Sequence, residues 1–513
     1  MLGHKTLLIN PPLINGIAFT RQGRCQERED VLGTTKPPYT LAVAASLLRG
    51  IGSDVRLIDA TAERIDIDDV VERLDREGFA PTLIVFPTTT PTFDADVSAV
   101  ARLKSRYQAP MFCFGPHAST VPGPSMERSP QVDGMFVGEP EDAIVQLAQV
   151  ASIDRVGDVP SITWRDATGT VRPHLAHGTF AGFATMPYPA WDLVTLDRYA
   201  LPLVNKRYVI VETSRGCPYT CDFCVAPIHQ GHKFRERSAK ALVDEIERTH
   251  RELGVDFFYL WGDTVTLNVK SFSAFCDELI ARNLPIQWFG NARADNLTDP
   301  AFVQRLKRSG CWMLALGIES ESDDVRKNMV KRLERQKIQR AFKNMREAGI
   351  RSFAFFIFGY PGETRESMEQ TTRYAIELDP DFANFYPAVP YPGTALYDKC
   401  VRESLLPPEL GDDWAKMEYS YYLLRGGGLD EAIVMNAIHR AKRRFFLRPS
   451  YMARHVSDVA RIAFSKQNIV WGVLSRTLFG TRVVDTGIRP NRGREVGSDP
   501  ELRGSDPTSV TPV

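Results

Sequence analysis

Residues 208–224, YVIVETSRGCPYTCDFC, join a β-branched run to a group of three cysteines. The run 208–213 is typical of a buried strand, because Val and Ile pack well on the two faces of a pleated sheet. Cys217, Cys221 and Cys224 follow at once on a CxxxCxxC spacing. We therefore expect the three thiols on the loop that follows a strand, where parallel α/β folds place their reactive groups.

The spacing of these cysteines is typical of a metal centre. Three thiolates can hold three irons of a [4Fe-4S] cluster and leave the fourth iron without a protein ligand, open to a reactant. The alternative is a structural zinc site, in which His229 or His232 supplies the fourth ligand that closes a tetrahedron. The array follows a strand instead of forming a compact ribbon, and this favours the cluster.

Strand-like and helical segments alternate from residue 205 to residue 400. The five helical segments are 238–253, 271–283, 301–310, 337–349 and 367–378. The six strand-like segments are 208–213, 257–263, 286–295, 312–320, 353–359 and 382–390. Regular alternation of this kind predicts parallel strands, and six units predict a partial (βα)6 barrel with its sites at the carboxyl ends of the strands.

A CxxxCxxC array after the first strand of such a barrel resembles the radical S-adenosylmethionine (SAM) superfamily, and the resemblance covers residues 205–400. It implies that the three cysteines ligate a [4Fe-4S] cluster and that SAM occupies the fourth iron. It also implies that one electron cleaves SAM to a 5′-deoxyadenosyl radical, which removes hydrogen from an unactivated carbon. A reductant such as flavodoxin or ferredoxin would supply that electron.

Further residues match the same family at later strand ends. Asp263 in YLWGD stands where the family receives the SAM amino group, although the middle residues depart from Gly-Gly-Glu. Arg293 in NARAD and Glu319 in ALGIES stand at positions that contact the SAM carboxylate and ribose. Phe223 is the usual aromatic residue between the last two cysteines, and Gly359 in FIFGYPGET resembles the strand beside adenine. The alternatives are that Asp263 caps a helix, that Arg293 and Glu319 form a structural ion pair, and that Gly359 lies in an ordinary turn.

Residues 1–150 contain a second series of strands and helices, with strand-like runs at 5–10, 55–60, 82–86, 111–115 and 134–139. Nearly continuous apolar strands separated by helices predict a doubly wound, Rossmann-like α/β domain. Its ligand crevice is expected beyond the strand carboxyl ends, although ordinary βα turns are an equal alternative there. No GxGxxG follows the first strand, which disfavours a dinucleotide. The candidate residues at these ends are Pro11, Thr89, Gly115, His117 and Glu139.

An α/β domain ahead of a radical SAM barrel resembles the cobalamin-binding subgroup, which includes class B methyltransferases and the anaerobic magnesium-protoporphyrin monomethyl ester cyclase. The segments INPP, KPPYTLAVAASLLR, FGPHAS and VGEPE carry this resemblance, whereas the DxHxxG motif of other cobalamin proteins is absent. It implies bound cobalamin and methylation of an unactivated carbon in a natural product, lipid or tetrapyrrole. The alternatives are the ring-closing cyclase and a transfer RNA methylthiotransferase, which needs three more cluster cysteines. A non-enzymatic iron–sulfur protein would not need the strand-end residues.

Composition excludes several classes of partner. Lys plus Arg and Asp plus Glu both number 63, so no net charge attracts a nucleic acid. Scattered single cysteines and the lack of a secretory segment predict a cytoplasmic protein. The resemblance implies a small-molecule or lipid-like substrate. No apolar window is long enough for a transmembrane helix, although the apolar run Ile469–Phe479 leaves peripheral membrane contact open.

Three further segments complete the predicted organisation. Residues 151–204 are rich in Pro and Gly and predict a linker with a small hairpin. Residues 401–483 show helical periodicity and predict a helical cap. Residues 484–513 lack apolar periodicity and predict a disordered tail.

Overall fold

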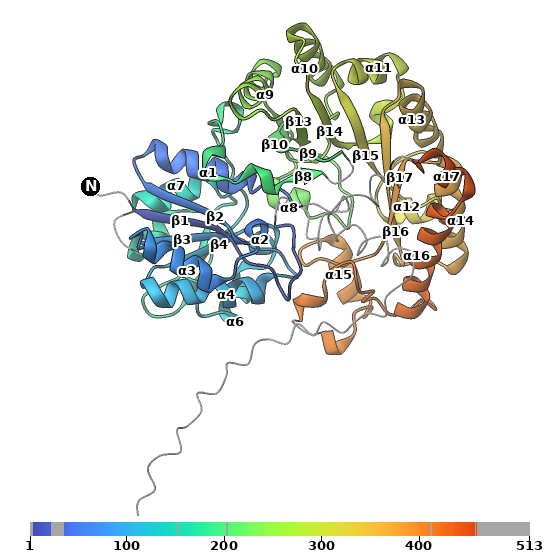
Figure 1. Cartoon of the computed structure of the whole chain (residues 1–513). Helices are drawn as coiled ribbons and strands as arrows, with labels where there is room; N and C mark the ends of the chain where they lie inside the picture. The colour runs from blue at the N-terminus through green and yellow to red at the C-terminus, as the bar shows by residue number, and fades with distance from the viewer. Residues whose placement is uncertain are drawn as a thin grey trace, which may run out of the picture.

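The computed structural model describes residues 4–21, 35–150, 153–201, 204–410, 413–456 and 458. Two sheets organise this part of the chain, one with seven strands and one with six (Figure 1). The predicted tail at 484–513, the run Ile469–Phe479 and the end of the predicted cap lie outside the described residues.

The first sheet has the strand order β2-β1-β3-β4-β5-β6-β7. Its first five strands are all parallel, and the chain reverses direction across the sheet between β1 and β3. This is the order of doubly wound domains, whose ligands bind at that switch point. The predicted α/β fold is therefore confirmed. The five strands are β1 (Lys5–Asn10), β2 (Asp54–Asp59), β3 (Leu83–Pro87), β4 (Met111–Phe114) and β5 (Gly134–Phe136).

Helices cover both faces of this sheet because its strands are apolar on both sides. Leu8 of β1 lies in a core shared with helices α1 (Tyr39–Gly50) and α7 (Glu141–Gln149). Its neighbours Leu7 and Ile9 lie in the opposite core with α3 (Ile67–Arg76) and α4 (Phe93–Tyr107). Alternate residues of a strand point to opposite faces, so one apolar run supplies both cores.

The first sheet extends beyond residue 150. Strands β6 (Ile162–Arg165) and β7 (Val171–Arg172) form an antiparallel hairpin, and β6 pairs with β5. The hairpin predicted within the linker therefore belongs to the sheet. A physical reason is that it satisfies the backbone groups at the edge of β5, which would otherwise stay unpaired.

The second sheet is an open series of six parallel strands in chain order. Helices α9, α10, α11, α13 and α14 connect successive strands and lie on the outer side of the sheet (Figure 1). The predicted partial barrel is confirmed. The strands are β10 (Val209–Glu212), β13 (Phe257–Trp261), β14 (Gln287–Ala292), β15 (Cys311–Glu319), β16 (Arg351–Phe358) and β17 (Phe382–Pro387). The helices are α9 (Ala239–Leu253), α10 (Val269–Arg282), α11 (Pro300–Arg308), α13 (Arg335–Ala348) and α14 (Arg365–Leu378).

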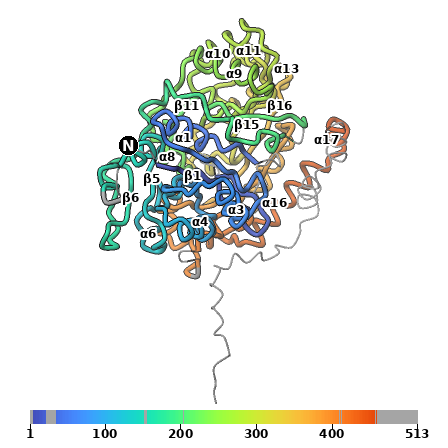
Figure 2. Tube along the Cα trace, turned by 60° about the vertical axis from the view of Figure 1, so that its left-hand side comes forward, coloured from blue at the N-terminus to red at the C-terminus, as the bar shows by residue number. Residues whose placement is uncertain are grey.

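The C-terminal region contains α15 (Ala395–Arg402), α16 (Glu431–Phe446) and α17 (Pro449–Arg454). Residues 413–424, here called the strap, lie between α15 and α16 and include only one short 3-10 turn, Trp414–Lys416. Side chains of the strap pack into the core of the first domain, and the orange segment before α16 runs along the base of that domain in Figure 2. None of the described helices is both long and apolar enough to cross a membrane.

Candidate active site at the barrel mouth

The cysteine loop, residues 216–234, begins after the short strand β11 (Ser214–Arg215) and contains helix α8 (Ala226–Gln230). Gly216 has φ +80°, and a Cβ added there would lie 2.2 Å from the carbonyl oxygen of Lys233. Only glycine permits this approach. The Cys217 amide then donates to the carbonyl oxygen of Gly231 at 3.1 Å, which fixes the chain at the first thiol.

All three cysteines line one cavity of about 260 Å³ at the mouth of the barrel. None of the three forms a disulfide. No three His, Cys, Asp or Glu side chains in the described ranges are grouped to hold one metal ion. A cubane cluster binds each thiolate to a different iron and so keeps the sulfurs apart. The donor set therefore fits a cluster better than a single zinc ion.

The two histidines that a zinc site would need lie elsewhere. His229 Nδ1 is 3.0 Å from the hydroxyl oxygen of Ser119 in the first domain, and burial lowers the pKa of His229 to about 4. His232 is exposed. Neither residue lines the cavity with the cysteines. The structure gives the zinc alternative no fourth ligand from either predicted residue.

Glu319 reaches the cavity through a distortion at the end of β15. The pairing of β15 with β16 shifts between Gly317 and Glu319, and Glu319 has φ +68°. Such backbone strain costs about 1–3 kcal/mol and is concentrated at functional sites. The Glu319 carboxylate accepts a hydrogen bond from Lys331 Nζ at 2.7 Å. A Cβ on Gly317 would lie 2.3 Å from that carboxylate, so glycine makes room for the pair.

Arg293 connects the third strand of the barrel to the cysteine loop. Its guanidinium lies 3.7 Å above the ring of Tyr219, which stands between Cys217 and Cys221. The same guanidinium donates to Asp295 at 3.2 Å and to the carbonyl oxygen of Lys331 at 3.3 Å. A buried cation is thus held beside the cysteine loop.

Asp263 and Phe223 also line the cavity, whereas Gly359 does not. Gly359 has φ +76°, and a Cβ there would lie 2.4 Å from the ring of Tyr422. Its neighbour Tyr360 lines the cavity and donates a hydrogen bond to Asp222 of the cysteine loop. Of the barrel residues predicted from sequence, the three cysteines, Phe223, Asp263, Arg293 and Glu319 therefore meet in one space.

The wall of the cavity away from the charged residues is largely apolar. Tyr386 and Tyr419 pack with their ring centroids 4.4 Å apart. An apolar wall excludes water from a reaction site and suits an organic substrate. The residues of this wall are Phe289, Met313, Phe353, Phe355, Ile357, Tyr386, Tyr391 and Tyr419.

The predicted residues of the first domain do not line this cavity. The Pro11 carbonyl oxygen accepts a hydrogen bond from the hydroxyl of Thr61 at 2.5 Å. The Thr89 hydroxyl is buried and lies 2.9 Å from that of Thr92. At Gly115 a Cβ would lie 2.4 Å from the carbonyl oxygen of Thr88. In this structure these residues hold the strand ends of the first sheet together.

His117 is enclosed by aromatic rings. The centroids of Phe93 and of Trp414 from the strap each lie 4.5 Å from the centroid of His117. Its Nε2 is 2.9 Å from the hydroxyl oxygen of Ser125, and burial lowers the pKa of His117 to about 3. His117 is therefore a neutral, buried side chain. Glu139 turns instead to Arg215 and Arg235 of the cysteine loop.

The space at the β1 and β3 switch point is only about 10 Å³, room for about one water molecule. The side chains of Phe19 and Arg21 line it, and Arg21 pairs with buried Asp96 at 2.7 Å. Lys36 lines both this space and the large cavity. It is the contribution of the first domain to the candidate active site.

Sequence reasoning missed Lys331, Tyr219 and Asn291, which also line the cavity. Asn291 donates to the hydroxyl of Tyr259 at 3.1 Å. Lys331 lies in the turn before α13, between two residues with positive φ, Val330 and Arg332. Nothing in the local sequence marks that turn. Asn291 and Tyr219, in contrast, lie inside segments that had already been identified.

Comparisons with known proteins agree with this geometry. The family model of the radical SAM superfamily matches residues 211–375. An uncharacterised methyltransferase of Pyrococcus horikoshii is 28% identical over 458 residues, which cover 88% of this chain and 95% of that protein. The anaerobic magnesium-protoporphyrin IX monomethyl ester cyclase of Cereibacter sphaeroides is 27% identical, over 82% of this chain and 68% of the cyclase.

Among solved structures, the chain resembles the radical SAM methyltransferase TsrM from Kitasatospora setae, determined with cobalamin and a [4Fe-4S] cluster bound. The TM-score is 0.63 at 19% identity, and the match covers 78% of each chain. At this identity the likeness shows a shared fold. The two-sheet fold of this chain is therefore similar to the fold of TsrM.

Proposed function

We propose that this chain, which carries a radical SAM domain at residues 211–375, methylates an unactivated carbon of a small organic or lipid-like substrate with cobalamin as the methyl carrier. The observation that carries the proposal is the cavity that joins three cysteine thiols, five charged residues and an apolar wall. The relative from Pyrococcus horikoshii is named a methyltransferase, and TsrM is a methyltransferase of similar fold.

The residues at the cysteine end of the cavity suit a cluster with bound SAM. Cys217, Cys221 and Cys224 would hold the cluster, and together with SAM it supplies the one-electron cleavage that starts hydrogen removal from the substrate. In this proposal Asp263 binds the amino group of SAM and Arg293 its carboxylate. Glu319 binds the ribose, and the hydrogen bond from Lys331 Nζ holds the Glu319 side chain at the cavity.

The apolar wall would hold the substrate. Phe353, Phe355 and Ile357 come from alternate positions of β16, so their side chains project from the same face of the strand into the cavity. They exclude water from the place where a reactive carbon centre forms, and this limits side reactions. The electron would come from a small reductant such as flavodoxin or ferredoxin.

The proposal for cobalamin depends on the fold and on the comparisons. The first domain has the strand order whose switch point receives ligands, and TsrM has cobalamin bound. The space among the described residues there is about 10 Å³, which is far too little for a corrin. Cobalamin binding at that edge therefore requires the residues that line this space to move apart.

Metal analysis tests both cofactors at once. The protein is purified without oxygen from cells supplied with hydroxocobalamin, beside the variant Cys217→Ala/Cys221→Ala/Cys224→Ala. We expect about four irons per chain and one cobalt in the wild type, and loss of the iron alone in the triple variant. Cys276→Ala, a buried core cysteine outside the cavity, is the control and should keep its iron.

Product analysis then separates methylation from other radical outcomes. With dithionite and SAM, the iron-loaded protein should release 5′-deoxyadenosine, and in the presence of its substrate also S-adenosylhomocysteine. Two outcomes would contradict methylation and support a cyclase-type reaction. One is a protein that holds iron but no cobalt. The other is conversion of the substrate with 5′-deoxyadenosine as the sole product of SAM. No cleavage of SAM by reduced, iron-loaded protein would contradict the radical assignment.

A further inference from the structure

The base of the cysteine loop is a two-stranded ribbon that carries two facing arginines. Strand β11 (Ser214–Arg215) pairs with β12 (Arg235–Glu236) in antiparallel fashion, and Arg215 and Arg235 are direct register partners. The loop between them, residues 216–234, contains all three cysteines. Whatever fixes these two arginines therefore fixes both ends of the loop.

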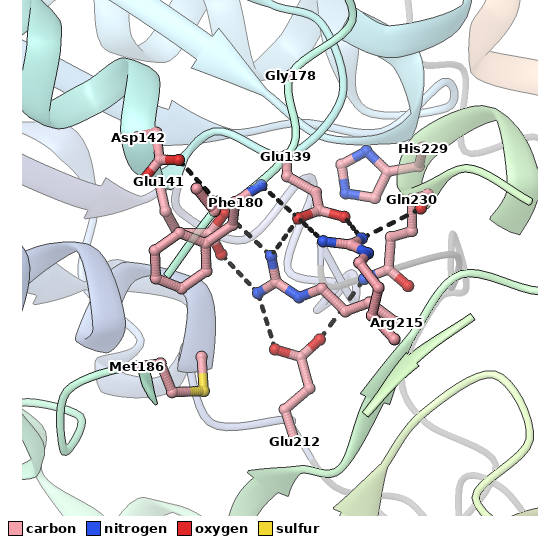
Figure 3. A network of polar contacts seen from close by, with 12 residues as sticks. Glu139, Glu141, Asp142, Gly178, Phe180, Met186, Glu212, Arg215, His229 and Gln230 are labelled. Carbon is pink, nitrogen blue, oxygen red and sulfur yellow. Dashed lines mark hydrogen bonds and ion pairs between the residues drawn. The ribbon is translucent and has the colours of Figure 1, made fainter. Parts of the chain in front are cut away.

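One carboxylate of the first domain, that of Glu139, binds both arginines, and Figure 3 shows it beside Arg215. Glu139 lies just after β5, and its Oε2 accepts from Arg215 Nη1 at 3.0 Å and from Arg235 Nη1 at 3.1 Å. The second oxygen of Glu139 accepts from Arg235 as well. Oε2 also accepts from the backbone amide of Phe180 at 2.7 Å. Glu139 is 2% exposed, so its acceptor positions are used within the protein.

Arg215 has two further carboxylate partners. Its guanidinium donates to Glu141 at 2.6 Å and to Glu212, at the end of β10, at 2.8 Å. Phe183 covers the pair, with its ring 5.0 Å from the Arg215 guanidinium and 5.7 Å from that of Arg235. Water is largely excluded here, and ionic hydrogen bonds in such surroundings are strong and directional. Three carboxylates and two guanidinium groups thus lock the loop base to both domains.

We propose that Glu139 is a positioning residue for the iron–sulfur cluster: by holding Arg215 and Arg235 together, it sets the spacing of Cys217 from the other two cysteines. Arg215 is separated from Cys217 only by Gly216, whose close approach to Lys233 leaves little freedom to absorb a shift. The first domain therefore takes part in cluster binding through its ionic contacts, in addition to any ligand of its own.

The inference rests on cluster binding by the three cysteines and not on methylation. Groups that orient metal ligands typically change metal affinity or activity by about 10–100-fold when they are altered. The effect should therefore be visible as faster loss of iron, with neither a substrate nor cobalamin present. Failure of the methylation proposal would leave this measurement unchanged.

Glu139→Gln is the decisive variant. Glutamine carries no negative charge, and its amide nitrogen donates, so it keeps one acceptor oxygen for the two arginines and loses the ionic contact with both. The iron-loaded protein is mixed anaerobically with excess EDTA, and the decay of the visible cluster absorbance is followed. We expect loss at least about 10-fold faster than in the wild type. The reduced cluster should also give a broadened electron paramagnetic resonance signal.

Asp96→Asn is the matched control. It breaks the buried pair of Arg21 and Asp96 in the same domain, at 2.7 Å and away from the cysteine loop. We expect it to lower the melting temperature of the iron-free protein while iron loss stays at the wild-type rate. Equal iron loss from Glu139→Gln and from the wild type would overturn the proposal, whatever the melting temperatures.

Arg235→Gln covers the case in which Glu139→Gln does not fold. Arg235 is more exposed than Arg215, 19% against 3% for the side chains, so its replacement leaves less uncompensated charge in the protein. It should accelerate iron loss in the same direction. A folded Arg235→Gln protein that keeps its iron as long as the wild type would likewise overturn the proposal.

Discussion

The two parallel sheets of this protein end in opposite ways. At the carboxyl edge of the barrel the strands open into a cavity of about 260 Å³ that collects cysteines, charged groups and aromatic rings. At the carboxyl edge of the first sheet only about 10 Å³ remains at the switch point, and His117 is enclosed by Phe93 and Trp414. Topology alone marks both edges as ligand sites. Which edge is open depends on what the rest of the chain places over it.

The side chains at the two edges differ accordingly. Each edge holds a buried ion pair at 2.7 Å, Glu319 with Lys331 at the open edge and Arg21 with Asp96 at the filled edge. The difference lies in the backbone and the surroundings: Glu319 has φ +68° and lines the cavity, whereas His117 at the filled edge is kept neutral by burial. The contrast teaches that backbone strain beside open space marks a candidate site better than position at a strand end does.

The largest expected effect comes from opening the filled edge. Trp414→Ala removes a ring that is 5% exposed and packs on His117, so the protein should lose about 3–5 kcal/mol of unfolding free energy. His117 should then become accessible and its pKa should rise towards the ordinary value. Urea unfolding measures the first effect, and modification by diethylpyrocarbonate, mapped to the His117 peptide, measures the second.

Trp191→Ala is the comparison for that variant. Trp191 is 2% exposed and packs beside Tyr39, away from His117. It should cost a similar free energy while His117 stays protected. If His117 reacts equally in both variants, general loosening rather than the strap controls access to the filled edge.

The next largest effect comes from removing a charged group at the open edge. Glu319→Gln removes the ion pair with Lys331 and leaves the lysine charge without its partner at 2.7 Å. We expect formation of 5′-deoxyadenosine to fall by about 10–100-fold, with weaker binding of SAM. Glu321→Gln is the control, since Glu321 pairs with Arg335 and does not line the cavity. Equal activity of the two variants would show that the Glu319 carboxylate has no part in the reaction.

The smallest effect per step of pH is a change in the stability of the region beneath the open edge. Glu363 is buried and accepts a hydrogen bond from the Gly359 amide at 2.7 Å, and burial raises the pKa of Glu363 to about 8. The folded protein keeps a proton that the unfolded chain has lost above its pKa of 4.5. The stabilisation that protonated Glu363 gives is therefore complete below pH 4.5. As the pH rises from 4.5 to about 8, the free energy of unfolding falls by about 1.4 kcal/mol per pH unit.

Glu363→Gln should remove that slope, which urea unfolding at several pH values between the two pKa values would measure. The exposed neighbour Glu366, changed to Gln, should keep the wild-type slope. An unchanged slope in Glu363→Gln would mean that Glu363 is ionised in the folded protein.

The open edge could be predicted from sequence because its signals are local. Cys217, Cys221 and Cys224 follow a strand on a diagnostic spacing, and Asp263, Arg293 and Glu319 each end a recognisable β-rich run. The carboxyl ends of parallel strands meet at one edge, so strand order alone gathers these side chains. The alternation of strands and helices likewise indicated both domains.

The filled edge could not be predicted because its determinants are distant in sequence. Trp414 covers His117 from a segment that belongs to the other end of the chain. Glu139 was expected to bind a cofactor, and in the structure it binds arginines 76 and 96 residues away. No spacing rule connects such positions. The place of the hairpin at 162–172 in the first sheet could not be predicted for a similar reason. Its partner is the edge of β5, which is formed only when the first sheet has assembled.

The strap also has a consequence for the order of events during protein synthesis. The first sheet is complete once β7 has been made, but Trp414 leaves the ribosome much later in the chain. At about 5–20 residues per second, the interval lasts on the order of ten seconds or more, and the edge beside His117 stands uncovered throughout it. His117 should therefore be open to small reagents in a nascent chain that ends before the strap. We expect a ribosome-bound chain arrested before Trp414 to react with diethylpyrocarbonate at His117, and a chain arrested after the whole strap has emerged to be protected there.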